Sequence, residues 1–315
     1  MHTDVSKLKS LTTASTRTGN YAARHCQPVM RSVRHKGGNL KGIILGIRKH
    51  PWTAFVYFFA SFSVLWTLIE GLTHFIPTLN IRGVPSLLGV VIVGIVYSAY
   101  RIRRPSSVIF NIAHTNTKIQ IKFGDIFGED GVRCIAVNEF FDSELGLPVS
   151  EKSLHGIFLT RCFGGHPESF DKIVKKELSD ISSETIQKKQ GKEAKYPIGT
   201  TANVNVNSDR YMCFALCRTD IKTLKAEADV PMLWQALEGL YSKARNSLGG
   251  FPLVLPLIGS GLSGIGLPSR DLLDLIVLSI IAESKKRQIG TLIKIILTPD
   301  RFNEIDLAEV EKYWR

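Results

Sequence analysis

A glycine-rich stretch late in the chain has the composition best suited to holding a ligand. Residues 256–268 read PLIGSGLSGIGLP, which is a short apolar strand, a loop of glycines and serines, and a helix start at Pro268-Ser269. Glycines allow positive φ and a close approach of the backbone to a ligand, with N–H groups pointing inward. Because such a loop precedes a helix N-terminus, it is suited to a phosphate or diphosphate. We therefore predict that function begins with binding a nucleotide.

Two further polar residues stand at the ends of predicted strands. Asp125 follows residues 118–123, in which polar and apolar side chains alternate, and Asn138 ends the apolar run GVRCIAVN at 131–138. In α/β proteins, ligands bind beyond the carboxyl ends of the strands. We therefore expect Asp125, Asn138 and the 259–264 loop to gather at one edge of a sheet.

No convincing catalytic or metal-binding constellation accompanies these motifs. Asp142, Glu144 and His155 are polar groups of the kind that activate water, but their spacing singles out none of them. The five cysteines form no CxxC pair and have no histidine at metal-ligand spacing, so we expect no metal site and no cofactor. Binding is the favoured activity, and hydrolysis is the alternative.

The order of the predicted elements indicates the fold class. After residue 105, strands alternate with helices, which is typical of an α/β domain with a mixed, largely parallel sheet flanked by helices. Strands are expected at 108–112, 118–123, 131–138, 210–218 and 291–297 and before the glycine-rich loop, and helices at 168–190, 229–247, 269–287 and 303–313. Residues 182–195 contain few apolar side chains, so we expect an exposed helix end and loop there.

Two uncharged apolar runs precede this domain. Residues 53–69 and 83–100 carry no charged side chain, and about 20 apolar residues span a bilayer. Buried core helices, or a cleaved signal peptide with one anchor, are the alternatives. About fifty residues precede the first run, which disfavours a signal peptide, and they do not resemble a surrounding core. We therefore predict a two-helix transmembrane hairpin.

Basic residues predict how this hairpin is oriented. Residues 1–50 contain ten Lys and Arg against the single Asp4, and three more arginines lie within 101–104. Positive residues stay on the cytoplasmic side, so both termini are predicted to face the cytoplasm from the inner membrane. Residues 105–315 contain 26 basic and 26 acidic residues, so the net charge of +12 lies beside the membrane. This pattern disfavours a nucleic-acid partner and favours the lipid bilayer.

The first apolar run is followed by two ionisable residues on one helix face. Glu70 and His74 are four residues apart. Ionisable groups inside a membrane favour a polar pathway or an oligomer contact. Both residues also lie close enough to the helix end to reach the far interface, and we favour that interpretation.

Three motifs together resemble a macro domain, the α/β module that binds ADP-ribose. GDIF at 124–127 is similar to the family's Gly-Asp-Ile, and CIAVN at 134–138 is similar to the strand that ends in Val-Asn. The loop at 256–268 resembles the segment that wraps the diphosphate and distal ribose, and YPIGTT at 196–201 also fits the family's order. The resemblance extends from about residue 110 to the C-terminus.

The resemblance implies a role for each matching residue. Asp125 would accept a hydrogen bond from the adenine amino group, and the 259–264 loop would hold the diphosphate. Glu139 and His155 would lie near the distal end of the ligand and are candidate contacts to a group added there. The implied ligand-binding residues are Asp125, Ile126, Asn138, Gly156, Gly199, Thr200, Gly259, Ser260, Gly261, Leu262, Ser263, Gly264 and Ile265.

One part of the family's pattern is missing. Hydrolytic macro domains continue Val-Asn with Ala-Ala-Asn and a glycine-rich loop. Here Asn138 is followed by Glu139-Phe140-Phe141-Asp142, and only Gly156 matches within 149–158. The second asparagine, which positions the reactive end, has no counterpart, so the resemblance favours binding over ADP-ribosyl hydrolysis.

The whole arrangement resembles the membrane effector of type II Thoeris anti-phage systems. It comprises a basic cytoplasmic tail at 1–50, a transmembrane hairpin at 51–104 and a macro-like nucleotide-binding domain at 105–315. In that family a TIR-domain enzyme makes an ADP-ribose-type messenger, a histidine conjugate. Its capture leads to oligomerisation, membrane disruption and abortive infection. A membrane-anchored ADP-ribosyl hydrolase is the alternative function.

Overall fold

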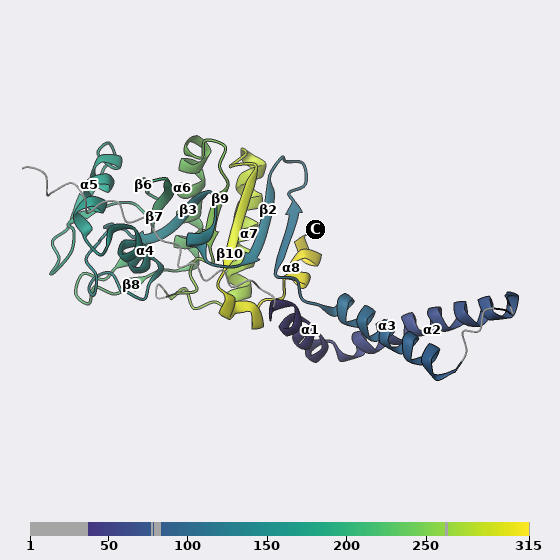
Figure 1. Ribbon diagram of the computed structural model, residues 1–315. Helices are drawn as coiled ribbons and strands as arrows, with labels where there is room; N and C mark the ends of the chain where they lie inside the picture. The colour runs from purple at the N-terminus through teal and green to yellow at the C-terminus, as the bar shows by residue number, and fades with distance from the viewer. Residues whose placement is uncertain (1–36, 77, 79–82, 262–263, 315) are drawn as a thin grey trace, which may run out of the picture.

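The computed structural model describes residues 37–76, 78, 83–261 and 264–314 (Figure 1). Three helices come first: α1 (Gly37–Lys49), α2 (Pro51–Phe75) and α3 (Val84–Ile102). The elements that follow are β1 (Ser107–Asn111), β2 (Lys118–Phe123), η1 (Ile126–Gly128), β3 (Val132–Asn138), α4 (Leu154–Phe163), α5 (Pro167–Glu177), β4 (Glu184–Thr185), β5 (Ala194–Lys195), β6 (Thr201–Val206), β7 (Asp209–Thr219), β8 (Ala226–Glu227), α6 (Val230–Ser247), β9 (Leu253–Pro256), α7 (Ser269–Lys286), β10 (Leu292–Leu297), η2 (Pro299–Asn303) and α8 (Leu307–Trp314).

One mixed sheet forms the centre of the domain. Its strand order is β1-β2-β10-β9-β3-β7-β6, with β8 paired to β7. The five inner strands, from β2 to β7, run parallel, and β1 and β6 lie antiparallel at the two sides. The predicted fold class, a mixed and largely parallel sheet flanked by helices, is confirmed.

Helices cover both faces of this sheet (Figure 1). One face packs on α6, α7 and α8 through a large apolar cluster that includes Ile121, Leu237 and Ile276. The other face packs on α4 and α5 through a second cluster around Phe158 and Phe170. The strands β3 and β7 are therefore buried on both sides, which explains their continuous apolar runs, whereas β2 nearer the side of the sheet alternates between buried and more exposed residues.

Two predicted segments differ from the structure. The helix expected over 168–190 ends at Glu177, and the chain then forms the short antiparallel pair β4–β5. Residues 182–195 are not simply an exposed loop, because the Lys188 side chain is completely buried. The sequence also gave no sign of α4 or β6, since both begin in segments rich in glycine and polar residues. Tertiary contacts override local composition at each of these positions.

The two long apolar helices pack against each other as an antiparallel hairpin. Gly94 of α3 lies against Phe58 of α2, where an added Cβ would come within 3.1 Å of the ring, and Ser98 Oγ donates to the Ala54 carbonyl oxygen at 2.8 Å. Small residues at such a seam let helices approach closely. Both helices are long and apolar enough to cross a membrane by length and composition.

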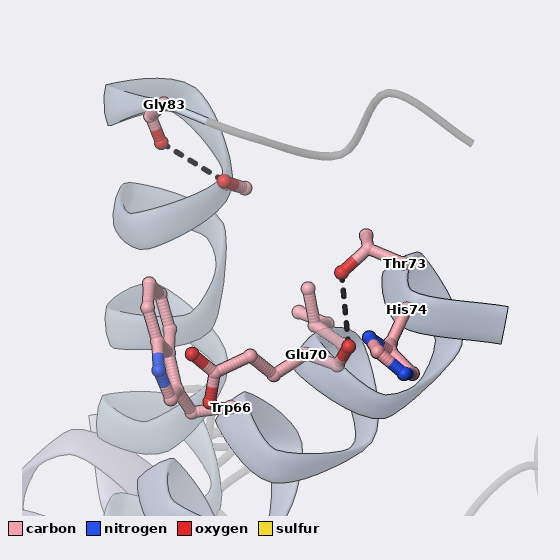
Figure 2. Close-up of a pocket in the computed structure, with 7 residues that line it drawn as sticks. Trp66, Glu70, Thr73, His74 and Gly83 are labelled. Carbon is pink, nitrogen blue, oxygen red and sulfur yellow. Dashed lines mark hydrogen bonds between the residues drawn. The ribbon is translucent and has the colours of Figure 1, made fainter. Parts of the chain in front are cut away.

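At the far end of the hairpin, α2 and α3 form a half-open pocket of about 410 Å³ (Figure 2). Glu70 and His74 line it, and the Glu70 side chain extends toward Trp66 (Figure 2). Gly83 and Ser86 close it from the first turn of α3. The two ionisable residues of the first predicted span therefore share one hollow at the end away from the domain.

A buried ion pair joins the hairpin to the domain. Arg104, two residues after α3, donates from Nε to Asp306 Oδ2 at 2.8 Å and from Nη1 to the Phe302 carbonyl oxygen at 3.2 Å. The side chains of Arg104 and Asp306 are 7% and 5% exposed. Since a charge is costly to bury alone, each of these two groups depends on the other.

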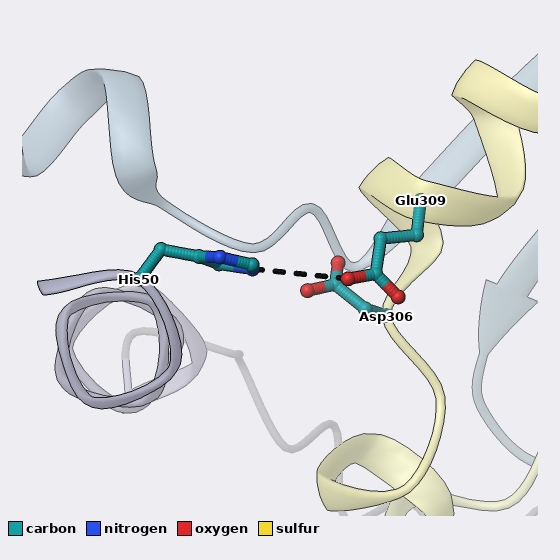
Figure 3. A group of neighbouring side chains, drawn as sticks. All are labelled: His50, Asp306 and Glu309. Atoms are coloured by element: carbon teal, nitrogen blue, oxygen red, sulfur yellow. Dashed lines mark ion pairs between the residues drawn. The ribbon is translucent and has the colours of Figure 1, made fainter. Parts of the chain in front are cut away.

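Three residues near this junction have ligand atoms within 4.8 Å of one another: His50, Asp306 and Glu309 (Figure 3). The Asp306 carboxylate is already paired with Arg104. The Glu309 carboxylate accepts from Lys49 Nζ at 2.8 Å, and its Oε1 lies 3.7 Å from His50 Nε2. We therefore interpret the group as an ion-pair cluster that fixes the start of α2 against α8.

Replacing Asp306 by asparagine is expected to destabilise the chain strongly. The variant leaves the Arg104 guanidinium buried without a counter-charge, and such losses cost about 3–5 kcal/mol in free energy of unfolding. Chemical unfolding of the full-length protein measures the change. Glu309→Gln is the control, since exposed pairs contribute about 1 kcal/mol or less. Equal effects of the two variants would contradict the importance of the buried pair.

Candidate functional site

The carboxyl ends of the parallel strands form the candidate site. Asp125 follows β2, the 257–266 loop follows β9 and Asn138 ends β3, so the three predicted motifs share one edge. The strands β10 and β9 lie between β2 and β3. At about 4.8 Å per strand, this spacing separates Asp125 and Asn138 by about 14 Å along the edge. The glycine-rich loop lies between them.

At the β2 end, Asp125 begins the short helix η1. Its Oδ1 accepts from the Phe127 N–H at 3.1 Å, and its Oδ2 accepts from Arg161 Nη1 at 3.0 Å. The Arg161 guanidinium also lies over the Phe127 ring, 4.6 Å from the ring centre. Ile126 points the other way and is buried against Val254 and the adjacent strand. The carboxylate of Asp125 is 58% exposed and stays open to a ligand.

At the β3 end, Asn138 is held in a tight turn with Asp142. The Asn138 amide donates to Asp142 Oδ2 at 2.8 Å, and the Asp142 N–H donates back to Asn138 Oδ1 at 3.0 Å. Asn138 is 8% exposed. Both ends of its side-chain amide are therefore engaged inside the protein in this structure.

The turn is fixed from outside by the segment between β4 and β5. The Lys188 ammonium, fully buried, donates to Asp142 Oδ2 at 2.5 Å and lies 4.0 Å from the centre of the Phe140 ring. The Lys192 N–H donates to Asp142 Oδ1 at 2.7 Å, and its ammonium donates to the Phe141 carbonyl oxygen at 2.6 Å. Burial lowers the pKa of Lys192, although Asp171 beside it opposes that effect.

The glycine-rich loop has the backbone geometry that its composition indicates. Gly259 takes φ +83°, and an added Cβ would lie 2.5 Å from the Ile265 side chain. Ser260 Oγ donates to the Leu257 carbonyl oxygen at 2.8 Å, and the Gly264 N–H donates to Gly261 O at 3.2 Å. The predicted site residues Leu262 and Ser263 lie outside the described residues.

Three other predicted site residues have close contacts within the fold. An added Cβ on Gly156 would lie 2.2 Å from the Ser150 carbonyl oxygen, inside the first turn of α4. Gly199 takes φ +91° against α6, and its N–H donates to the Ala215 carbonyl oxygen at 2.9 Å. The Thr200 N–H donates to the Pro197 carbonyl oxygen. These contacts shape the backbone around the sheet edge.

The two candidate distal contacts, Glu139 and His155, are both buried. Glu139 Oε1 accepts from the Thr219 N–H at 3.3 Å, and burial raises the pKa of its carboxyl group. His155 is 6% exposed beside Phe170, and its Nε2 has no hydrogen-bond partner among the described residues. Burial, aided by the positive charge of Lys192, lowers the pKa of His155 to about 3.

Sequence reasoning missed Arg161 and Lys188. Each lies on an element for which the sequence gave no clear signal, α4 for Arg161 and the β4–β5 segment for Lys188. A lysine in a polar run resembles any solvated lysine, so its burial could only be seen once the fold was known.

The family of the chain follows from a comparison with protein-family models. Residues 119–298, more than half of the chain, match the model described as Thoeris protein ThsA, Macro domain. The chain belongs to this family. The match begins in β2 and ends just after β10, so it includes every strand end of the candidate site.

Solved macrodomains are similar at low sequence identity. Two structures from Oceanobacillus iheyensis, one with ADP and one with MES bound, share 16% and 17% identity, with TM-scores of 0.44 and 0.45. Each alignment covers 66% of this chain and 96% of the other. A Trypanosoma brucei macrodomain in complex with ADP-ribose has 9% identity, a TM-score of 0.39 and coverage of 62% and 68%. No curated protein sequence matches the chain.

The three polar groups that the sequence offered for the alternative activity, hydrolysis, differ in their surroundings. Asp142 is paired with Lys188, and Glu144 Oε2 accepts from Gln190 at 2.8 Å. His155 is buried and neutral near pH 7, because its pKa lies far below that pH.

Replacing Lys188 by methionine is expected to destabilise the macro domain by about 3–5 kcal/mol, because Asp142 is left buried without its cation. Lys189→Met is the matched control, since Lys189 is exposed and its substitution is expected to change stability by about 0.5 kcal/mol or less. Chemical unfolding of both variants measures the difference. Similar stabilities would show that the pair does not fix the turn.

Acidification is expected to destabilise the protein partly through His155. Its pKa is depressed in the folded state, so below about pH 6.5 the unfolded chain binds a proton that the folded chain excludes. Stability from this group is therefore complete above that pH and lost as pH falls toward 3. Between pH 6.5 and 5, the wild type should lose about 2 kcal/mol more than His155→Leu. Parallel pH curves would contradict this assignment.

Proposed function

We propose that this protein is a membrane effector of anti-phage defence whose macro domain captures an ADP-ribose-type messenger made by a TIR-domain partner. Capture favours association of several copies, and the gathered hairpins disrupt the inner membrane, which ends in abortive infection. The messenger can shift this equilibrium only if it binds the associated state better than the single copy.

The order of the strand ends carries the proposal. A carboxylate stands after β2, a glycine-rich loop after β9 and a polar turn after β3, over about 14 Å of one sheet edge. That order suits a ligand with a base at one end, a diphosphate in the middle and a sugar at the other. The family assignment supports the same ligand class.

The link from this edge to the hairpin supports a role beyond binding. The chain continues from β10 at this same edge and forms η2. Within η2, the Phe302 ring packs edge-on against the Phe123 ring, with 4.9 Å between the ring centres. Arg301 donates to Ser269 Oγ at 3.0 Å, at the first residue of the helix that follows the glycine-rich loop. A few residues later, Asp306 holds Arg104 below the hairpin. These contacts connect the helix that follows the glycine-rich loop to Arg104, two residues after α3.

The first test alters the ligand site without touching the hairpin. Asp125→Ala removes the carboxylate at the base end, and Gly261→Phe fills the loop. An added Cβ at Gly261 meets no atom within 4 Å, so this variant should fold and exclude the ligand. Both variants are expected to abolish growth arrest during infection in cells that also express the TIR partner. Membrane insertion, measured by carbonate extraction, should be unchanged.

The control for this test is Asp180→Ala, which removes an exposed carboxylate beyond the end of α5. It should retain wild-type growth arrest. Growth arrest that survives both Asp125→Ala and Gly261→Phe would contradict the proposed function.

A further inference from the structure

Arg161 has an unusual position for a surface arginine of α4. It lies in the last turn of that helix, yet it contacts η1, which is 36 residues away in sequence at the end of β2. Its Nη1 donates to Asp125 Oδ2 at 3.0 Å, and its guanidinium lies 4.6 Å from the centre of the Phe127 ring. The side chain is 34% exposed, so this contact lies at the surface of the candidate site.

The two contacts together restrict the Asp125 carboxylate. One oxygen is held by the Phe127 N–H and the other by the guanidinium, so both ends of the carboxylate have a donor. A guanidinium on an aromatic face is held by cation–π attraction as well as by its ion pair. The carboxylate is therefore fixed in direction, and each oxygen keeps a lone pair for a further donor.

The chemistry of the carboxylate also determines which base it favours. An ionised carboxylate is an acceptor only, so it favours a base that presents an amino group and disfavours one that presents a carbonyl oxygen. Without a fixed direction, an exposed carboxylate rotates and discriminates less well, because ordering it on binding costs entropy.

We infer that Arg161 is a specificity-determining residue of the nucleobase end of the site. It positions Asp125, with Phe127 as the surface that holds the guanidinium flat, so that the carboxylate selects a 6-amino purine over a 6-oxo purine. This inference rests on the proposed function, because it names the residue that makes the captured nucleotide an adenine nucleotide.

The test compares two ligands that differ only in the base. ADP-ribose presents an amino group, and inosine diphosphate ribose presents an oxygen in the same position. Titration calorimetry on the full-length protein in nanodiscs gives both dissociation constants. The wild type should prefer ADP-ribose. Arg161→Ala should weaken ADP-ribose binding about tenfold and inosine diphosphate ribose binding much less, so the preference shrinks.

Conservative and matched variants separate positioning from a general structural effect. Arg161→Lys keeps the charge and should recover part of the preference, and Phe127→Leu should lose part of it. Arg210→Ala is the matched control, because Arg210 also lies over a phenylalanine, Phe251, at 3.8 Å, but at the opposite end of β7 from the site. It should leave both dissociation constants unchanged.

The outcomes distinguish a failure of the role given to Arg161 from a failure of nucleotide binding as a whole. An unchanged preference in Arg161→Ala, or an equal loss for both ligands, overturns the role of Arg161 while leaving nucleotide binding intact. Failure of the wild type to bind either ligand overturns the proposed function and this inference with it. A reduced preference with retained binding of inosine diphosphate ribose supports the inference.

Discussion

The parallel arrangement of the five inner strands is the constraint on which the rest of the structure depends. Parallel neighbours cannot be joined by tight turns, so each return crosses a face of the sheet. The helices on both faces, the two buried apolar clusters and the polar edge all follow from that requirement. The same constraint orders the strand ends along the edge, and this order determines the length and polarity of the ligand that the edge suits.

The second organising interaction is the buried contact between Arg104 and Asp306. The two side chains are in direct contact although they are 202 residues apart in sequence, since Arg104 lies two residues after α3 and Asp306 lies in the loop before α8. A charged residue at this place gives the hairpin a defined docking point on the domain. The contact also places the hairpin beside β1 and β2, the side of the sheet on which the base end of the candidate site lies (Figure 1).

Much of the fold was predictable because the strands carry clear local signals. The alternation at 118–123 and the apolar run at 131–138 gave β2 and β3 almost to the residue, and Pro231 marked the start of α6. The predictions that failed concern segments whose structure depends on contacts between residues distant in sequence. The polar stretch that forms β4 and β5 is held in place because Lys188 and Lys192 contact the buried turn at Asp142. Composition alone predicts that lysines are exposed, which is true of most lysines but not of Lys188.

The candidate site was predictable in its backbone and less so in its side chains. Strand ends and glycines have local signatures, so the edge itself could be placed from sequence. Whether a polar side chain there is open or already engaged depends on its neighbours in space, as Asn138 and His155 illustrate. The partner of Asp125 comes from a helix that the sequence did not indicate, which is why Arg161 was missed.

The pairing of Asp142 with Lys188 has a practical consequence for engineering this protein. The segment around Lys188 resembles a surface loop that would accept a fluorescent tag. However, the buried ion pair joins two residues 46 positions apart in sequence, so an insertion next to Lys188 would disturb the turn at Asp142. The hairpin turn between β6 and β7 is a better choice, because Asn207 and Ser208 are exposed and lie at the amino end of β7, opposite the edge of the candidate site. An insertion there would leave the edge of the candidate site undisturbed, so a tag at this turn could follow the protein while the site keeps its contacts.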